Sequence, residues 1–172
     1  MILGMSVAAF VQLHVVISLI GIATGLIVMF GMLGSWRMPG LTAVFLLTTI
    51  LTSATGFVIP PLLFEKTLPS HMVGLLSLVL LAIACVALYV MKLRGAWRWI
   101  YALTALVSLY LNVFVLVVQS FLKVPALAAL APAVPPAPPS GPVFAVVQGI
   151  VLVFFVVLTV GAWRRFKPMA FA

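Results

Sequence analysis

Acidic side chains are almost absent from this chain of 172 residues. Glu65 is the only carboxylate side chain, and there is no aspartate. Reactions that need two carboxylates, such as glycoside hydrolysis, are therefore excluded within a single chain. A proton relay built from acidic side chains inside a membrane is excluded for the same reason. We therefore expect a protein without catalytic activity of its own.

Cysteine is equally scarce, because Cys85 is the only one in the sequence. A single cysteine cannot form an internal disulfide or provide a cysteine-based metal site. Cys85 lies within a long apolar run, where a free cysteine usually packs as a small hydrophobic side chain. The sequence thus predicts no metal site.

Charged residues make up only 6% of the chain, whereas 66% of its residues are hydrophobic. Soluble domains typically contain about 25% charged residues. A water-soluble fold of this size could not bury so much apolar surface, so the expected solvent is lipid. The net charge of +8 is spread between apolar runs, which favours anionic lipid over nucleic acid as its partner. We expect contact with the lipid bilayer and no nucleic acid.

Five apolar runs have about the 20 residues that a helix needs to cross a bilayer. Glycine- and proline-containing segments separate several of these runs. The fold class predicted is all-α: residues 1–172 form a single transmembrane domain, a bundle of five transmembrane helices. The predicted spans are residues 6–33, 41–63, 70–91, 99–122 and 143–163.

A proline-rich segment, residues 124–142, precedes the last predicted span. Proline cannot continue a helical hydrogen-bond pattern, so we expect this segment to be extended, irregular and partly polyproline-like. It is predicted to be a periplasmic loop. Three roles remain open for it: a linker, a lid over the outer surface, or a docking segment for a periplasmic partner.

The basic residues predict the orientation. Alternating spans would place seven of the nine on one side and only Lys66 and Lys123 on the other. Cytoplasmic loops carry the excess of lysine and arginine, so the N-terminus is predicted outside and the C-terminus inside a bacterial inner (plasma) membrane. All four tryptophans fall on the cytoplasmic side, as in an interfacial belt. The residues of that side are Arg37, Lys92, Arg94, Arg98, Arg164, Arg165 and Lys167, with Trp36, Trp97, Trp99 and Trp163.

Polar side chains within the predicted spans concentrate in the outer half of the membrane. Lipid cannot satisfy such groups, so they are expected to face other helices. Two interpretations remain open: an outward-facing ligand pocket, or hydrogen bonds that join helices. Gly21 and Gly25 on the first span also predict a close helix contact of the small-xxx-small type. The predicted pocket residues are Ser18, Thr52, Thr55, Ser108, Asn112, Gln119 and Gln148.

His14 and His71 are the two histidines of the chain, and both are predicted in the outer leaflet on different helices. Imidazoles on two helices of a bundle can ligate haem b. Their different depths argue against one shared iron, and a quinone site is the other cofactor hypothesis. A histidine within a span can also simply bind a neighbouring Ser, Thr or Gln. His14 and His71 are the candidate cofactor-binding residues, for haem b or a quinone.

Several short segments carry a resemblance to known proteins. They are Leu13-His14, TSATGF at 52–57, PSHMVG at 69–74, LNVFV at 111–115 and KVPAL at 123–127. With these segments the chain resembles an uncharacterised family of small multi-pass bacterial inner-membrane proteins. The resemblance implies the location of the protein. It implies no reaction, because that family has no assigned activity.

The sequence therefore favours a non-catalytic integral membrane protein. It is expected to be an accessory subunit or a small-ligand-binding bundle, with its polar site in the outer leaflet. The alternatives are a haem b- or quinone-linked electron-transfer protein that uses His14 and His71, and a small permease. The expected protein partner is a larger membrane complex or a second copy in a homo-oligomer. Ion-coupled transport is disfavoured because no carboxylate lies within a predicted span.

Overall fold

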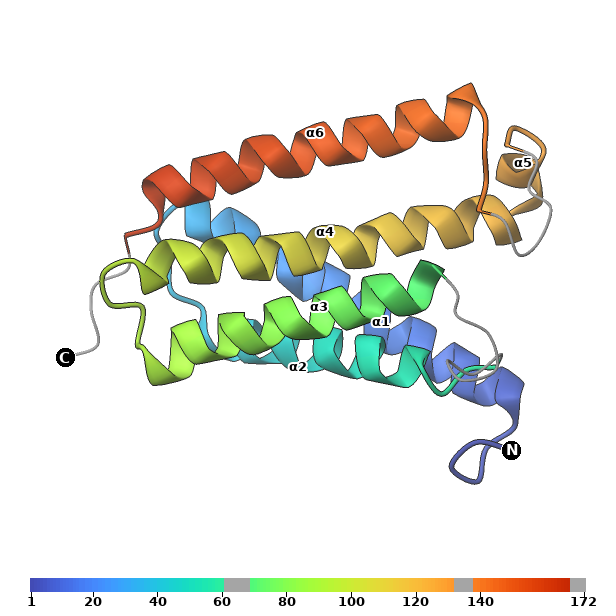
Figure 1. Ribbon diagram of the computed structural model, residues 1–172, viewed down its shortest axis with the longest axis horizontal. Coiled ribbons are helices and arrows are strands. Elements are labelled where there is room, and N and C mark those ends of the chain that lie inside the picture. The colour runs from blue at the N-terminus through green and yellow to red at the C-terminus, as the bar shows by residue number, and fades with distance from the viewer. Residues whose placement is uncertain (61–68, 132–137, 168–172) are drawn as a thin grey trace.

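The computed structural model describes residues 1–60, 69–131 and 138–167. Five of its helices are long and apolar enough to cross a membrane, which confirms the predicted number. They run alternately up and down, side by side (Figure 1). The five helices are α1 Val7–Leu33, α2 Pro39–Gly56, α3 Pro69–Cys85, α4 Trp97–Lys123 and α6 Pro142–Arg165. A π-helix, η1 Val86–Val90, continues α3, and a short helix, α5 Pro125–Ala128, follows α4.

Local sequence explains where three of the helices begin. The side chain of Ser6 caps α1, because its hydroxyl accepts a hydrogen bond from the backbone N–H of Ala9 at 3.2 Å. Helices α2 and α6 begin with Pro39 and Pro142. Proline suits the first helical position, because its fixed φ fits the helix and its missing N–H would have no partner there.

The structure differs from two expectations about the segments between helices. Helix α2 ends at Gly56 rather than residue 63, and residues 57–60 form a turn; residues 61–63 lie outside the described residues. The cause is the proline pair that begins at Pro60, because a residue before proline is disfavoured in the helical conformation. The segment predicted as extended contains the helical turn α5, in which Pro125 occupies the favourable first position. Residues 132–137 of that segment also lie outside the described part.

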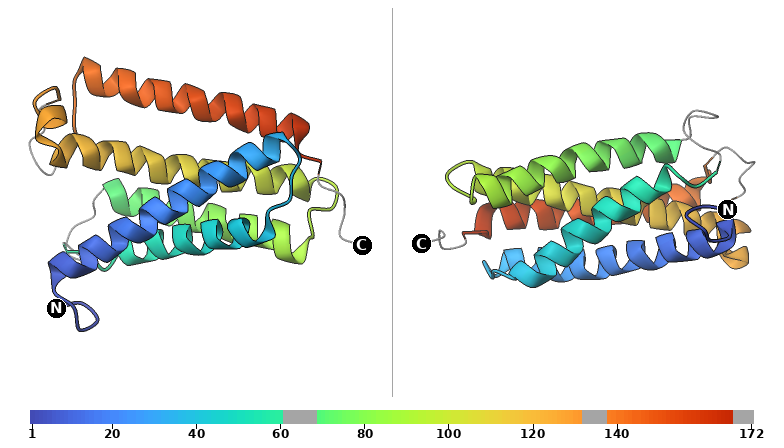
Figure 2. Two further views of the ribbon diagram at one scale, coloured as in Figure 1. Left: turned by 180° about the vertical axis from the view of Figure 1, so that it is seen from behind. Right: turned by 90° about the horizontal axis from the view of Figure 1, so that it is seen from below.

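Helix α4 is the centre of the bundle. It packs against α1, α2, α3 and α6, whereas α6 packs only against α4 and α1 among the described helices. Figure 2 shows α1 crossing the bundle obliquely, with α6 on the outside. Two aromatic pairs connect α6 to α4, with ring centroids 5.7 Å apart for Tyr110 and Phe155 and 5.4 Å apart for Phe121 and Phe144. Because α6 packs only against these two helices, most of its outer surface is apolar and exposed.

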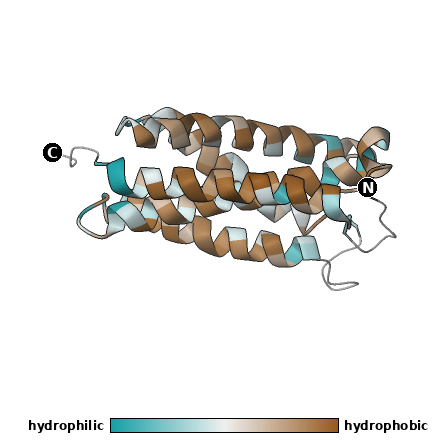
Figure 3. Cartoon of the chain, turned by 90° about the horizontal axis from the view of Figure 1, so that it is seen from above, coloured by the Kyte–Doolittle hydropathy of each residue, from teal (hydrophilic) through white to brown (hydrophobic). Residues whose placement is uncertain are grey.

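Charge distinguishes the two ends of the bundle. Hydrophobic residues cover most of each helix, and hydrophilic residues gather at the ends (Figure 3). One end, which we call the basic end, contains the α1–α2 connection, the η1–α4 connection and the C-terminus of α6. The opposite end, the Lys123 end, contains the start of α1 and the end of α4. At the basic end, the hydroxyl of Ser35 contacts the carbonyl of Arg165 and accepts from the N–H of Lys167, which holds α6 against the α1–α2 connection.

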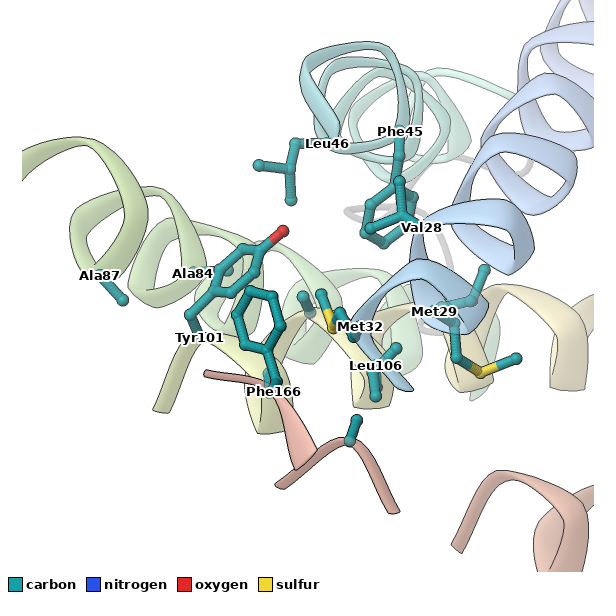
Figure 4. Close-up of a cluster of buried hydrophobic side chains, with 14 of the residues drawn as sticks. Val28, Met29, Met32, Phe45, Leu46, Ala84, Ala87, Tyr101, Leu106 and Phe166 are labelled. Atoms are coloured by element: carbon teal, nitrogen blue, oxygen red, sulfur yellow. The ribbon is translucent and has the colours of Figure 1, made fainter. Parts of the chain in front are cut away.

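The core lies in the half of the bundle nearer the basic end, which we call the closed half. Figure 4 shows side chains of this core from α1, α2, α3, η1 and α4 meeting near Phe166, and Phe155 and Ala162 of α6 also belong to the core. Gly25 marks the closest approach, because a Cβ atom there would lie only 2.6 Å from Leu109 Cδ1 and 2.8 Å from Phe45. At Gly21 the hydroxyls of Thr48 and Thr49 would be 3.1 Å away. The close contact predicted at Gly21 and Gly25 is therefore present.

Candidate ligand-binding site

A cavity of about 510 Å³ lies between α1, α2, α3 and α4 in the half nearer the Lys123 end. We call this half the cavity half. The volume falls within the range of about 300–1,000 Å³ that is common for small-molecule sites. Six of the nine residues predicted to bind a ligand or cofactor line this cavity. They are His14, Ser18, Thr52, His71, Asn112 and Gln119.

Helical spacing explains why these residues meet. His14 and Ser18 are four residues apart on α1, and Asn112 and Gln119 are seven apart on α4, so each pair shares one face of its helix. The last turns of α2 and the first turns of α3 complete the walls. Gly56 helps to keep the space open, because a Cβ atom there would lie 3.7 Å from the His14 ring, an ordinary contact distance.

Thr55 orients the ring of His14. The His14 Nδ1 atom lies 2.8 Å from the Thr55 hydroxyl oxygen, and that hydroxyl lies 2.6 Å from the carbonyl of Leu51. Because the hydroxyl proton is directed to the carbonyl, the Thr55 oxygen accepts the Nδ1–H of His14. This pattern assigns the tautomer in which Nε2 carries a lone pair. His14 therefore offers the cavity an acceptor.

Asn112 is the deepest polar group on the α4 side of the cavity. Its side chain is only 8% exposed, and its Oδ1 accepts a hydrogen bond from the Ser18 hydroxyl at 2.8 Å. Its Nδ2 atom is buried and has no hydrogen-bond partner in the described structure. An unpartnered buried donor is unfavourable by about 1–3 kcal/mol. A turn of the amide toward a ligand with an acceptor oxygen would remove this cost.

His71 lies in the first turn of α3 and is 4% exposed. Its ring stacks on that of Phe57, with centroids 5.8 Å apart and planes inclined by 28°. Phe57 belongs to the turn that follows α2, so this pair joins the ends of α2 and α3. Gly74 lies beside it, where a Cβ atom would be 3.3 Å from the Phe57 ring. The stacked pair therefore forms an aromatic part of the cavity wall.

Three of the predicted site residues do not line the cavity. Thr55 acts through His14, as described above. Ser108 is 0% exposed, because it lies one turn farther into the closed half than Asn112, and its hydroxyl bonds the Thr104 carbonyl of the same helix. Gln148 is on α6, which does not border the cavity, and its Nε2 donates to the Phe114 carbonyl at 3.1 Å. These three residues are corrected from lining residues to supporting ones.

Most hydroxyls in the spans bond their own helix rather than a neighbour. Each donates to a carbonyl three or four residues earlier, which satisfies it without a second helix. Side-chain hydrogen bonds also join helices: His14 with Thr55, Ser18 with Asn112, Tyr101 with Thr42, and Gln148 with the Phe114 carbonyl. The self-satisfied hydroxyls belong to Thr24, Thr48, Thr49, Thr52, Thr104, Ser108 and Ser120.

Sequence reasoning missed the contribution of α3. Ser70 and Ser77 line the cavity together with Gly74 between them. Their spacing of seven residues, with the glycine four residues after Ser70, places small and polar groups on one helix face. This pattern was the available signal.

Among the described residues, Lys123 at the end of α4 is the one lysine, arginine or acidic residue that lines the cavity. Glu65, the only carboxylate side chain of the chain, and Lys66 lie outside the described residues. Within residues 1–60, 69–131 and 138–167, no three His, Cys, Asp or Glu side chains are grouped to hold a metal ion. The wall thus consists of apolar side chains with a few directional polar atoms, the usual composition of a site for an apolar ligand.

Comparison with protein-family models, with curated proteins and with solved structures found no match to this chain. The resemblance of its sequence segments to multi-pass inner-membrane proteins therefore stays a prediction. The chain is a multi-pass membrane protein by the length and apolar composition of its five helices.

Proposed function

We propose that this protein binds a small, lipid-soluble ligand within the membrane and has no catalytic activity of its own. The observation that carries the proposal is a cavity of about 510 Å³ whose wall includes Asn112, a residue with a buried and unpartnered side-chain donor. Structural interactions between helices do not require an unsatisfied donor beside an open space. A bound ligand with an acceptor atom accounts for both the unpartnered donor and the open space.

Retention of a ligand tests this proposal directly. The protein is purified in a mild detergent and analysed by native mass spectrometry for a small molecule bound at one per chain. Gly56→Leu fills the cavity from α2 and is expected to abolish retention, whereas Thr104→Val, whose hydroxyl bonds its own helix outside the cavity, is expected to leave it unchanged. A wild-type protein that retains no small molecule, or a Gly56→Leu variant that retains as much, would contradict the proposal.

We place the protein in the bacterial inner membrane, with its N-terminus outside and its C-terminus in the cytoplasm. Support comes from the basic end, where seven of the nine lysines and arginines of the chain occur together with four tryptophans. The excess of basic residues marks the cytoplasmic side. The cavity then opens in the outer leaflet. A reporter fused after Lys167 is expected to be active only in the cytoplasm, and periplasmic activity would reverse the orientation.

The ligand-binding bundle is proposed to act as an accessory subunit of a larger membrane complex or as a homo-oligomer. The exposed apolar surface of α6 supports contact with lipid or with another transmembrane helix. Co-purification with other membrane proteins after mild solubilisation is the expected result for an accessory subunit. A monodisperse single chain under those conditions would exclude this role and leave the ligand-binding proposal standing.

Electron transfer through haem b is a second candidate, and one observation favours it. A ligating histidine usually donates its other ring N–H to a neighbour, as His14 does to Thr55, and His71 lines the same cavity. Protein from haem-supplied cells should then show a Soret band and a reduced α band, both lost in His14→Ala and in His71→Ala. A featureless visible spectrum after full haem supply would exclude this candidate.

A further inference from the structure

We propose that a groove on α6 at the basic end binds one anionic phospholipid, with the lipid phosphate at Arg164 and Arg165 and an acyl chain along the valines of the same groove. The groove is separate from the cavity, which lies in the other half of the bundle. The proposal therefore does not depend on the ligand of the cavity. It rests on the shape of the groove, the order of its residues, the charge at the basic end and the anchoring of α6.

The groove has a volume of about 450 Å³, and all its lining residues belong to the last turns of α6. Its length from residue 156 to 165 is about 13 Å, close to the hydrocarbon thickness of one leaflet, about 15 Å. At Gly161 no side chain fills it, and a Cβ atom there would lie 2.9 Å from Leu33 Cδ2, so the end of α1 adjoins the groove (Figure 2). The lining residues are Val156, Val157, Val160, Gly161, Arg164 and Arg165.

Apolar and basic residues follow one another along the groove as the parts of a phospholipid do. The valines come first, and the two arginines come one turn later, at the end of the helix. Side chains on a helix lean toward its N-terminus, so Arg164 and Arg165 lean back over the groove. Trp163 on the same turn is 54% exposed, as expected at the level of the lipid headgroups. A guanidinium group binds phosphate with two parallel hydrogen bonds.

The charge at the basic end is not balanced by acidic side chains. Arg164 and Arg165 are followed by Lys167, and residues 1–60, 69–131 and 138–167 contain no aspartate or glutamate. An anion from outside the described chain must therefore neutralise these cations. Because the valine wall of the groove suits a hydrocarbon chain, a lipid phosphate fits better than a free anion. Basic pockets beside transmembrane helices are known to bind anionic headgroups.

The end of α6 is anchored, which holds the two arginines in place beside α1. The hydroxyl of Ser35 contacts the Arg165 carbonyl, and the Phe166 N–H donates to the Ala162 carbonyl at 2.8 Å. Free carbonyls at the C-terminus of a helix repel an anion. Two of these carbonyls are already bonded, so their repulsion of a phosphate is reduced.

The proposal is tested by native mass spectrometry of the delipidated protein in mild detergent. Dioleoylphosphatidylglycerol and dioleoylphosphatidylcholine are titrated separately, and the fraction of chains that carry one lipid is measured. Each basic residue near an anionic lipid contributes about fivefold in affinity, so two arginines should favour phosphatidylglycerol by about 25-fold. Equal affinities for the two lipids would overturn the proposal, and this comparison needs no variant.

A matched pair of double variants tests the role of the arginines. Arg164→Gln with Arg165→Gln should remove the preference for phosphatidylglycerol. Arg94→Gln with Arg98→Gln removes the same charge at the same end of the bundle, but outside the groove, and should keep the preference. Equal losses in the two double variants would show that net charge rather than the groove selects the lipid, and would overturn the proposal.

The acyl-chain part is tested on two valines of α6 that are almost equally exposed. Val157 is 61% exposed and lines the groove, whereas Val153 is 62% exposed and lies one turn outside it. Val157→Phe should lower the affinity for phosphatidylglycerol by about fivefold or more, the factor that corresponds to about 1 kcal/mol of overpacking. Val153→Phe should leave the affinity unchanged. Equal effects of the two substitutions would contradict an acyl chain in the groove.

Other occupants would give different results. If inorganic phosphate binds the wild-type protein as tightly as phosphatidylglycerol does, the arginines bind a free anion and the lipid assignment is wrong. If phosphatidylglycerol is not preferred and the spectra show a dimer that Val157→Phe dissociates, a second copy covers the groove and the proposal is also wrong. Neither result changes the proposed function of the cavity, which is tested by ligand retention in Gly56→Leu.

Discussion

The same four helices pack in two different ways in the two halves of the bundle. In the closed half, Gly25 brings α1 so near to α2 and α4 that even a methyl group would collide with Leu109 and Phe45. In the cavity half, Gly56 faces His14 across ordinary contact distance and leaves space. Glycine therefore has opposite consequences in the two halves. It removes a barrier to close packing in one and leaves a space unfilled in the other.

The polar groups differ in the same way. In the closed half, the buried hydroxyls of Thr49, Thr104 and Ser108 bond carbonyls of their own helix, and the Tyr101 hydroxyl bonds Thr42 across α4 and α2. The cavity half contains two hydrogen bonds between helices, His14 with Thr55 and Ser18 with Asn112, and the second leaves Asn112 Nδ2 without a partner in the described structure. The difference indicates that the closed half holds the bundle together, so the cavity half can remain hollow.

The largest effect is expected from truncating a core side chain. Leu109 is 0% exposed, and Leu109→Ala should lower the free energy of unfolding by about 2–5 kcal/mol, because the closed half cannot fill the space that is left. Leu116→Ala, seven residues along the same helix but on the cavity wall, should have a smaller effect. Unfolding in mixed detergent and SDS measures both. Equal losses would show that the two halves are packed alike.

A smaller effect is expected from adding one methyl group to a glycine. Gly25→Ala should destabilise the protein by about 1–3 kcal/mol, since its Cβ atom would overlap Leu109 and Phe45. Gly56→Ala meets nothing closer than 3.7 Å and should be neutral or slightly stabilising. The same unfolding assay compares them. In the double variant Gly25→Ala with Leu109→Ala, the total loss should be smaller than the sum of the losses in the two single variants. The reason is that Leu109→Ala removes one of the two overlaps with the new Cβ atom.

The smallest effect is expected from removing a hydroxyl. Thr55→Val deletes the acceptor of the His14 Nδ1–H and should cost about 0.6 kcal/mol, the average for a hydrogen bond between transmembrane helices. Thr104→Val removes a hydroxyl that bonds only its own helix and should cost less. A loss for Thr104→Val as large as that for Thr55→Val would show that a hydroxyl bonded to its own helix contributes as much as one that joins two helices.

Much of the fold could be predicted from the sequence because the membrane imposes a simple rule. Backbone groups in lipid must be satisfied within the helix, so each long apolar run forms a helix, and five runs were found. The end of α2 was misplaced because residues 57–60 are apolar enough to continue a span, but the proline pair beginning at Pro60 stops the helix earlier. The turn at Pro125 was missed because proline was treated as a helix breaker rather than as a first helical residue.

The candidate site was predictable along each helix but not between helices. The spacing of His14 with Ser18, and of Asn112 with Gln119, placed each pair on one face. No spacing could show that Ser18 would bond Asn112, or that Gln148 would lie on a helix away from the cavity. Those outcomes depend on which helices become neighbours, and an apolar sequence contains few constraints on that choice.

The sequence by itself determined the solvent, the number of spanning helices and the uneven distribution of charge between the ends, because these follow from composition and from the order of residues along one chain. Only the tertiary structure decided where the bundle closes and where it stays open. That outcome depends on the contact of Gly25 with Leu109 and Phe45 in one half, and on the unfilled space beside Gly56 in the other. The unpartnered Asn112 amide acquires its meaning there, because a polar group becomes a binding group only when packing places it beside an open space.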